Sequence, residues 1–309
     1  MLPFKLIYDK RYDLNLGAHV FPSQKYRLIH DALLAEGIAE PSDFLSPEPA
    51  TDDDVLLVHS REYVRKLKSG TLSYAEQLRM EIPYSLEMID ACWLAAGGSI
   101  LAARRALADG WCANIGGGFH HAYPDHGEGF CVLHDVAIAI RRMQFDRAIE
   151  SAMVVDTDVH HGNGTAAIFG GDPTVFTLSI HQENNYPYPK PPSNIDINLP
   201  DRTGDADYLA ILEKNLNQAF EEFQPNLLFY IGGADPYRED QLGGLALTLD
   251  GLKRRDALVF DYARRHRVPV AITLAGGYAQ RVSDTVRIHI ATILAARDVA
   301  QLTTAGAPG

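Results

Sequence analysis

Between residues 154 and 164 the chain reads Val154-Val155-Asp156-Thr157-Asp158-Val159-His160-His161-Gly162-Asn163-Gly164, an apolar run that ends in two carboxylates and two imidazoles. The apolar residues indicate the end of a buried strand. Because side chains alternate along a strand, Asp156, Asp158 and His160 are expected on one face. Carboxylates and an imidazole on one face form a ligand set for a divalent metal, above all zinc. A hydrogen-bonded loop after a strand is the alternative interpretation.

Outward from this segment, apolar runs typical of buried strands alternate with segments of helical periodicity. The predicted strands are 5–8, 112–115, 152–156, 174–180, 226–231 and 268–274, and the predicted helices are 23–36, 61–68, 86–108, 134–142, 206–223, 250–265 and 283–296. This alternation predicts one α/β domain over residues 1–309, with a mainly parallel central sheet and helices on both faces. The small, polar tail at about 303–309 is expected to be loose.

Several apolar runs end in glycine-rich or acidic clusters, at residues 116–118, 156–158, 232–235 and 276–278. In open parallel sheets, ligands bind beyond the carboxyl ends of the strands. Glycine at such a position lets the backbone turn sharply and approach a ligand closely. These four strand ends therefore predict one shared pocket.

Composition excludes several classes of protein. The hydrophobic fraction is 46%, the charged fraction 22% and the formal net charge -12, which is typical of a globular protein without a phosphate-binding surface. Arginine pairs such as Arg254-Arg255 are interpreted as solvated helix faces. Three cysteines without a paired spacing indicate a reducing compartment, and we expect a cytoplasmic protein with no nucleic-acid or membrane partner.

Two adjacent histidines follow three glycines in Gly116-Gly117-Gly118-Phe119-His120-His121. A dinucleotide-binding loop requires a glycine where His121 stands, so a nucleotide site is excluded. Imidazoles titrate near neutrality, and a pair of them beside a metal cluster favours general acid/base catalysis. A structural role in the loop is the alternative.

A third metal ligand is expected from the acidic segment that begins at Asp235. Asp235 is nearest the strand end, whereas Glu239 and Asp240 lie further along and are also interpreted as solvated or loop-capping acids. Tyr278, after two glycines, could donate its hydroxyl to a developing oxyanion, although such a tyrosine is more often a packing residue.

Together these motifs resemble the zinc-dependent histone deacetylase family. The resemblance spans about residues 5–294 and rests on Gly116–His121, Gly129-Phe130-Cys131, Asp156–Gly164, the 235–240 block and Gly276-Gly277-Tyr278. Within the family the chain is most similar to the class IV branch, the histone deacetylase 11 type. The pointers are Gly117–His121, the Asp240-Gln241-Leu242-Gly243-Gly244-Leu245 segment, the Lys253-Arg254-Arg255-Asp256 helix and the short length. The resemblance implies an arginase-like α/β fold.

The resemblance also implies roles for individual residues. The implied zinc ligands are Asp158, His160 and Asp235; the implied catalytic residues are His120, His121, Asp156, Asn163 and Tyr278; and the implied lining of an acyl-lysine tunnel is Gly129, Phe130 and Tyr186. A structural potassium or sodium ion is implied at Asp156, Asp158, His160, Ser179 and Ile180, several of them through backbone carbonyls. Asp156 would orient His120 and Asn163 would orient His121. Because asparagine carries no charge, the pKa of His121 is expected to be low.

The implied activity is that of a zinc-dependent hydrolase, which removes acetyl or longer fatty-acyl groups from the lysine side chains of proteins or peptides. One alternative is an amidohydrolase that acts on acetylated polyamines or other small amides. A second is a metal-holding interaction module with little turnover. A third is a manganese arginase-type hydrolase, for which the sequence offers too few ligands. The acyl-chain length and the role of Glu81, either a rim contact or a solvated acid, are left open.

Overall fold

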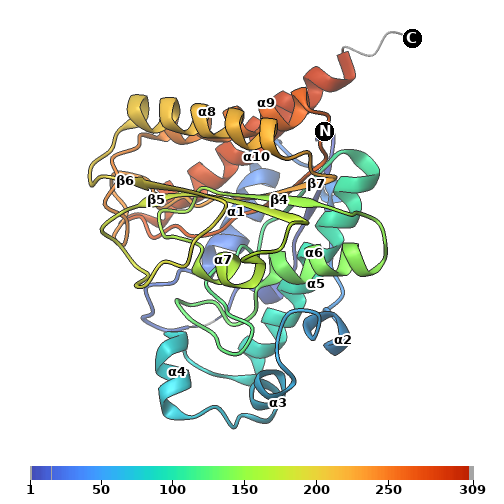
Figure 1. The fold of residues 1–309 in the computed structure, drawn as a ribbon, viewed down its shortest axis with the longest axis vertical. Coiled ribbons are helices and arrows are strands. Elements are labelled where there is room, and N and C mark those ends of the chain that lie inside the picture. The colour runs from blue at the N-terminus through green and yellow to red at the C-terminus, as the bar shows by residue number, and fades with distance from the viewer. Residues whose placement is uncertain (1, 15, 306–309) are drawn as a thin grey trace.

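A computed structural model describes residues 2–14 and 16–305. Within them, eight strands form one parallel sheet in the order β2-β1-β3-β8-β7-β4-β5-β6 (Figure 1). The strands are β1 (Lys5–Ile7), β2 (Phe44–Leu45), β3 (Trp111–Asn114), β4 (Ala152–Asp156), β5 (Val175–Gln182), β6 (Ile195–Leu199), β7 (Leu227–Ile231) and β8 (Val270–Thr273). The central strands are buried along their whole length, as expected for a sheet covered on both faces. The predicted fold class is confirmed.

The two unpredicted strands are the edges of the sheet. Strand β6 alternates buried and exposed residues instead of forming a continuous apolar run, because an edge strand is only half covered. Strand β2 has two residues, which is too short for any period to be recognised. The six predicted strands are all present, with ends shifted by up to two residues.

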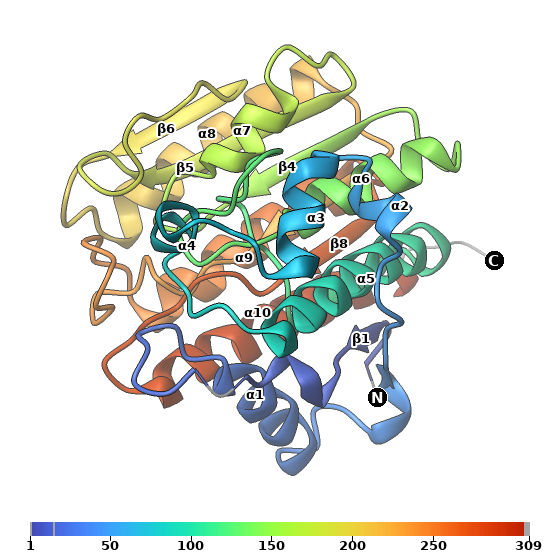
Figure 2. The same cartoon turned by 90° about the horizontal axis from the view of Figure 1, so that it is seen from below.

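Helices cover both faces of the sheet. In Figure 1, α8, α9 and α10 lie on one side and α5, α6 and α7 on the other, and Figure 2 shows α2, α3 and α4 outside α5. The helices are α1 (Gln24–Ala35), α2 (Asp52–Val55), α3 (Arg61–Ser69), α4 (Tyr74–Met80), α5 (Leu86–Asp109), α6 (Asp135–Phe145), α7 (Asn163–Phe169), α8 (Asp205–Glu222), α9 (Leu249–Arg265) and α10 (Val282–Ala305). The unpredicted helices α2, α4 and α7 have at most seven residues each.

Helix α10 continues well past its predicted end. The backbone of residues 303–305 is helical rather than loose, and the remaining residues of the predicted tail, 306–309, lie outside the described residues. Helix α5 is long and apolar enough to cross a membrane by composition, but 67% of its most apolar window is buried inside the protein. The core helix of a globular domain passes the same test, and this burial is that of a core helix.

Acid should weaken the fold through His59, which is buried at the N-terminus of α6. Its Nε2 accepts the backbone N–H of His134 at 3.0 Å, and burial lowers the pKa of His59 from 6.5 to about 4. Between pH 6.5 and 4, His59 is therefore protonated in the unfolded chain but not in the folded chain. The free energy of unfolding consequently decreases as pH falls through that range. From pH 7 to 5 the loss from His59 is about 2 kcal/mol.

Urea unfolding of the wild type and of His59→Gln at pH 7 and 5 measures this contribution. Glutamine keeps an acceptor for the amide but does not titrate, so its free energy of unfolding should fall about 2 kcal/mol less than that of the wild type. Equal losses in the two proteins would show that His59 does not contribute to the pH dependence.

Candidate metal and catalytic site

The parallel register brings four strand ends to one level. Asn114 of β3 pairs with Thr273 of β8, Thr273 with Ile231 of β7, and Ile231 with Asp156 of β4. Each is the last residue of its strand, so the four following loops start side by side at the carboxyl edge. A cavity of about 20 Å³ lies among three of these loops and the 129–131 turn, and includes Gly118, His121, Asp158, His160 and Tyr278 in its wall. Three of the four loops that were expected to share one pocket line this cavity, and residues 232–235 are not in its wall.

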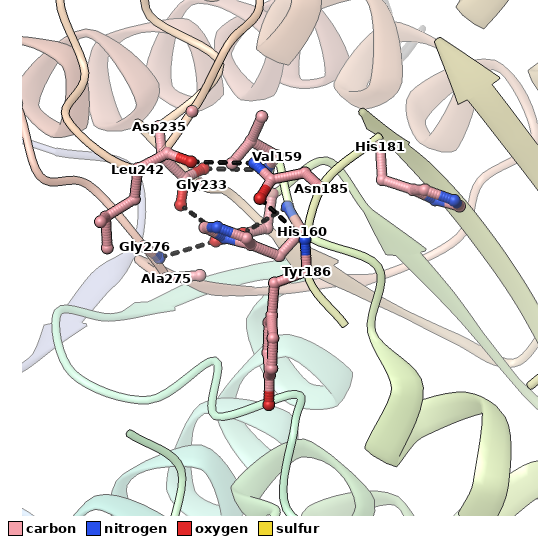
Figure 3. A network of polar contacts seen from close by, with 12 residues as sticks. Val159, His160, His181, Asn185, Tyr186, Gly233, Asp235, Leu242, Ala275 and Gly276 are labelled. Atoms are coloured by element: carbon pink, nitrogen blue, oxygen red, sulfur yellow. Dashed lines mark hydrogen bonds and ion pairs between the residues drawn. The ribbon is translucent and has the colours of Figure 1, made fainter. Parts of the chain in front are cut away.

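Asp158 and His160, which line this cavity, converge with Asp235, which is fully buried. One ligand atom from each lies within 4.8 Å of the others, and all three side chains are buried. The Nδ1 of His160 is 3.1 Å from Asp158 Oδ1 and 3.5 Å from Asp235 Oδ2. Figure 3 shows Asp235 and His160 pointing toward each other.

Backbone amides hold the two carboxylates in place. Asp235 Oδ1 accepts the N–H of Val159 at 2.9 Å, and Asp158 Oδ2 accepts the N–H of Gly276 at 2.9 Å. Asp235 Oδ2 is buried without any hydrogen bond. A buried carboxylate oxygen without a hydrogen bond, with a second carboxylate nearby and only one imidazole nitrogen at 3.5 Å, is unfavourable unless a further cation neutralises the charge. Two carboxylates and one imidazole fit a zinc ion that keeps an open position.

The reason given for this convergence from sequence was partly wrong. Strand β4 ends at Asp156, and residues 157–162 form an irregular loop, so strand alternation does not place Asp158 and His160. The loop itself turns them toward Asp235. Asp156 has a different partner, because its Oδ2 lies 2.6 Å from the Nδ1 of His120.

The ligand cluster is strongly perturbed in the metal-free protein. Burial and the nearby carboxylate of Asp158 raise the pKa of Asp235 to about 7. Burial acts to lower the pKa of His160, but the hydrogen bond with Asp158 and the charges of Asp158 and Asp235 outweigh burial and raise that pKa to about 10. These opposed shifts arise because two carboxylates share one imidazole at short range, and a divalent cation would neutralise the excess negative charge.

His120 and His121 lie side by side in different electrostatic environments. Their ring centroids are 4.0 Å apart. Burial acts to lower the pKa of His120, but Asp156 and Asp158 raise it to about 9. Burial, together with repulsion from His120 and His160, lowers the pKa of His121 well below 6.5. At neutral pH, His120 is therefore charged and His121 is neutral, with a lone pair available for a proton. The low pKa expected for His121 is found, and burial is its main cause.

Two glycines allow Tyr278 to reach the cavity. A Cβ on Gly276 would lie 2.1 Å from Asp235 Oδ2 and 2.4 Å from Asp158 Oδ2, so only glycine fits between the carboxylates. Burial raises the pKa of Tyr278 well above 10, and its hydroxyl therefore stays protonated. The N–H of Tyr278 donates to Asp240 Oδ2 at 2.7 Å. Asp240 also accepts the N–H groups of Leu242 and Gly243, so it organises the loop and is not among the ligands.

One wall of the cavity is a tight turn. The N–H of Cys131 donates to the carbonyl of Glu128 at 2.8 Å, and the two central residues, Gly129 and Phe130, have φ of 53° and 67°. Positive φ at both central residues is typical of a type I′ turn. The turn places Gly129 and Phe130 in the cavity wall. Tyr186 is not among the residues of that wall, and its ring centroid is 5.0 Å from that of His121.

Comparison with known proteins identifies the family of this chain. Residues 19–293 match the model of the histone deacetylase domain family. The chain belongs to the histone deacetylase family. It is 42% identical to an uncharacterized protein of Picosynechococcus sp. over 297 residues, which are 96% of this chain and 99% of that protein.

Relatives with functional names are more distant. Histone deacetylase 2 of Arabidopsis thaliana is 31% identical, covering 91% of this chain and 77% of that protein. A histone deacetylase-like amidohydrolase of Pseudomonas aeruginosa is 28% identical, covering 85% and 73%. The crystal structure of the HDA15 HD domain superposes with a TM-score of 0.79 at 23% identity, covering 98% and 92% of the two chains, which shows a shared fold.

The residues implied to bind a monovalent cation in this histone deacetylase domain lie in the 157–162 loop and in the adjoining strands β4 and β5. Asp156 of β4 is the register partner of Ser179 in β5, and Ile180 follows Ser179. The Ser179 hydroxyl is 3.0 Å from His181 Nδ1. Proximity of Asp156 and Ser179 is compatible with one ion, and the cation site stays a prediction.

A second cluster of possible metal ligands consists of His161, His181 and Asp196. The His161 Nε2 is 3.1 Å from Asp196 Oδ1, and both ring nitrogens of His181 have hydrogen-bond partners. No residue belongs to both clusters, so the described residues contain no bridging ligand for a two-metal, arginase-type centre.

Three charged residues of the site were not predicted from sequence. Lys25 of α1 is fully buried and donates from Nζ to the carbonyl of Ala275 at 2.5 Å. Arg255 of α9 is fully buried and donates to the carbonyls of Gly233 and Thr157, which contradicts its interpretation as part of a solvated face. Glu128 contacts Asn163 and Tyr186. Each is identified only by its partners, which are distant in sequence.

Proposed function

We propose that this member of the histone deacetylase family is a zinc-dependent hydrolase that removes the acyl group from the side-chain amide of lysine in proteins or peptides. One observation carries the proposal. Asp235, whose Oδ2 has no hydrogen bond, converges with Asp158 and His160 to form an open ligand set beside the cavity that His121 and Tyr278 line. A binding module has no need of a neutral imidazole and a protonated phenol beside its metal ligands.

Each residue of the site has a separate role in the proposed reaction. Zinc held by Asp158, His160 and Asp235 would polarise the acyl carbonyl and acidify the attacking water. His121, neutral and held at Nδ1 by Asn163, takes the water proton at Nε2 and passes it to the leaving lysine amine. Tyr278 donates its hydroxyl to the carbonyl oxygen as negative charge develops. His120, charged through Asp156, adds positive charge beside the same cavity.

Cavity size favours a short acyl group. A second, apolar cavity adjoins the catalytic one, shares Phe21, Tyr26, Gly117, Phe119 and Phe130 with it, and has a free volume of about 30 Å³. That volume admits roughly one water-sized group. The methyl of an acetyl group is about this size, whereas a long acyl chain requires side chains such as Leu14 and Met88 to move.

A panel of lysine peptides carrying acetyl, butanoyl, octanoyl and tetradecanoyl groups tests both activity and chain length. We expect kcat/KM to fall about tenfold or more from acetyl to octanoyl, because forcing extra methylenes into a packed cavity costs about 1–3 kcal/mol. An acetylated polyamine serves as the comparison substrate. Faster cleavage of the polyamine would favour the small-amide alternative, and faster cleavage of tetradecanoyl would refute the assignment to short chains.

Several finer assignments are also proposals. The 240–245 segment supports a place in the class IV branch, and one catalytic domain is proposed over residues 1–309. A potassium or sodium ion is proposed at Asp156, Asp158, His160, Ser179 and Ile180. Free Cys92, Cys112 and Cys131 support a cytoplasmic location. The net charge of -12 supports an acyl-lysine protein or peptide as partner, rather than nucleic acid.

A further inference from the structure

We propose that Glu128 is a positioning residue for His121, acting through Asn163, and that it fixes which ring nitrogen of His121 carries the proton. The inference rests on the proposed function, since it concerns the base of that reaction. His120 has a carboxylate directly on its ring, from Asp156. His121 has an amide in the same position, from Asn163. An amide can be placed in two ways, so something further must determine which way it faces.

Glu128 makes that choice. The amide nitrogen of Asn163 donates to Glu128 Oε1 at 2.7 Å, while its oxygen lies 2.6 Å from His121 Nδ1. A carboxylate only accepts hydrogen bonds, so the nitrogen of the Asn163 amide must face Glu128 and its oxygen must face His121. An amide oxygen also only accepts, so Nδ1 of His121 must carry the proton. The lone pair is then left on Nε2, which the proposed mechanism needs for proton transfer.

Without the carboxylate the amide could turn over. Its nitrogen would then donate to Nδ1 of His121, and the ring proton would move to Nε2. That tautomer cannot accept a proton from water at Nε2. Partial burial would raise the pKa of Glu128, but hydrogen bonds from His126, Tyr186 and Asn163 outweigh burial and lower that pKa. Glu128 therefore stays an acceptor at neutral pH.

Glu128 also connects Asn163 and His121 to the turn in the cavity wall. The Tyr186 hydroxyl donates to the same Oε1 at 2.8 Å, and Glu128 opens the turn that carries Gly129 and Phe130. A Cβ on Gly129 would lie 2.7 Å from His121 Cδ2 and 2.9 Å from the Tyr186 hydroxyl oxygen, so the turn packs directly on the histidine. Movement of Glu128 would disturb the tunnel wall as well as the base.

The direct test measures the His121 tautomer in metal-free protein by ¹⁵N NMR of labelled histidine. In the wild type, Nδ1 of His121 should carry the proton. In Glu128→Gln, whose side chain can donate as well as accept, a signal from the Nε2–H tautomer should appear. Glu128→Asp, which keeps the charge, should retain the wild-type tautomer. This readout does not depend on activity, so it stands even if the chain proves to have no deacylase activity.

Kinetics provide a second test. Glu128→Gln should lower kcat on an acetyl-lysine peptide about tenfold, the lower range for partners one step removed from a catalytic centre, with KM and zinc content unchanged. If Glu128 acts through Asn163, the double variant Glu128→Gln/Asn163→Ala should be no slower than Asn163→Ala alone. Exposed Glu183→Gln is the matched control, with wild-type kcat.

Two results would overturn the inference. The first is a wild-type tautomer in Glu128→Gln. The second is a double variant whose loss in kcat equals the product of the losses in Glu128→Gln and Asn163→Ala, which would mean that Glu128 acts independently of Asn163. Melting temperatures of all variants, measured in parallel, separate these results from loss of the fold.

Discussion

Asp235→Asn should produce a folded protein that no longer retains zinc and deacylates at least a thousandfold more slowly than the wild type. Asparagine keeps an oxygen to accept the N–H of Val159, but it puts an amide nitrogen in place of Oδ2, which has no hydrogen bond. The site then has one carboxylate fewer, and an N–H group points in the direction in which Oδ2 would bind the metal. A metal supplies several kcal/mol of transition-state stabilisation, which corresponds to about a thousandfold or more in rate.

Metal analysis after dialysis, together with steady-state kinetics, checks this prediction. Asp207→Asn, on the exposed surface of α8, is the matched control and should keep one zinc per chain. Chelator should inactivate the wild type, and added zinc should restore it. Full zinc occupancy and normal turnover in Asp235→Asn would exclude Asp235 as a ligand.

In the absence of metal, the Asp235→Asn substitution should stabilise the fold. In metal-free wild type, burial and repulsion from the carboxylate of Asp158 raise the pKa of Asp235 to about 7. Removing one of the two charges relieves this repulsion. In the presence of chelator, Asp235→Asn should therefore melt at a higher temperature than the wild type, whereas with zinc the order should reverse.

The fold and most of the site could be predicted because each depends on a local pattern. Buried parallel strands are continuous apolar runs, so β4 and β7 are visible in the sequence, whereas the alternating edge strand β6 is not. Glycine and acidic residues at the strand ends locate the pocket, because parallel strands place their carboxyl ends together. The loop after Asp156 could not be predicted, and strand alternation was the wrong explanation for it.

The charged residues around the site were not predictable for a different reason. Lys25, Arg255 and Glu128 look like ordinary surface residues in sequence, since lysine, arginine and glutamate are seldom buried. Their partners are 250, 22 and 35 residues away, respectively, at Ala275, Gly233 and Asn163. No periodicity reports contacts at such separations. Their roles follow only from which backbone carbonyl or amide the fold brings to them.

Tyr278→Phe should lower kcat about a hundredfold while leaving zinc content unchanged, as expected for loss of one donor to a developing oxyanion. The ring fills the cavity wall in both proteins, so the packing with Phe130 is kept, and only the hydroxyl is removed. Because burial and the charges of Asp158 and Asp235 raise the pKa of Tyr278 well above 10, this hydroxyl remains a donor at every pH at which the enzyme would be assayed.

Kinetics at saturating acetyl-lysine peptide, with zinc measured in the same samples, distinguish this role from packing. Tyr74→Phe, at an exposed position on α4, is the control and should keep the wild-type rate. The transition state develops more negative charge on the carbonyl oxygen than the bound substrate carries, so KM should change little while kcat falls. A wild-type kcat in Tyr278→Phe would reduce this tyrosine to a packing residue and leave the carbonyl oxygen to be polarised by the metal alone.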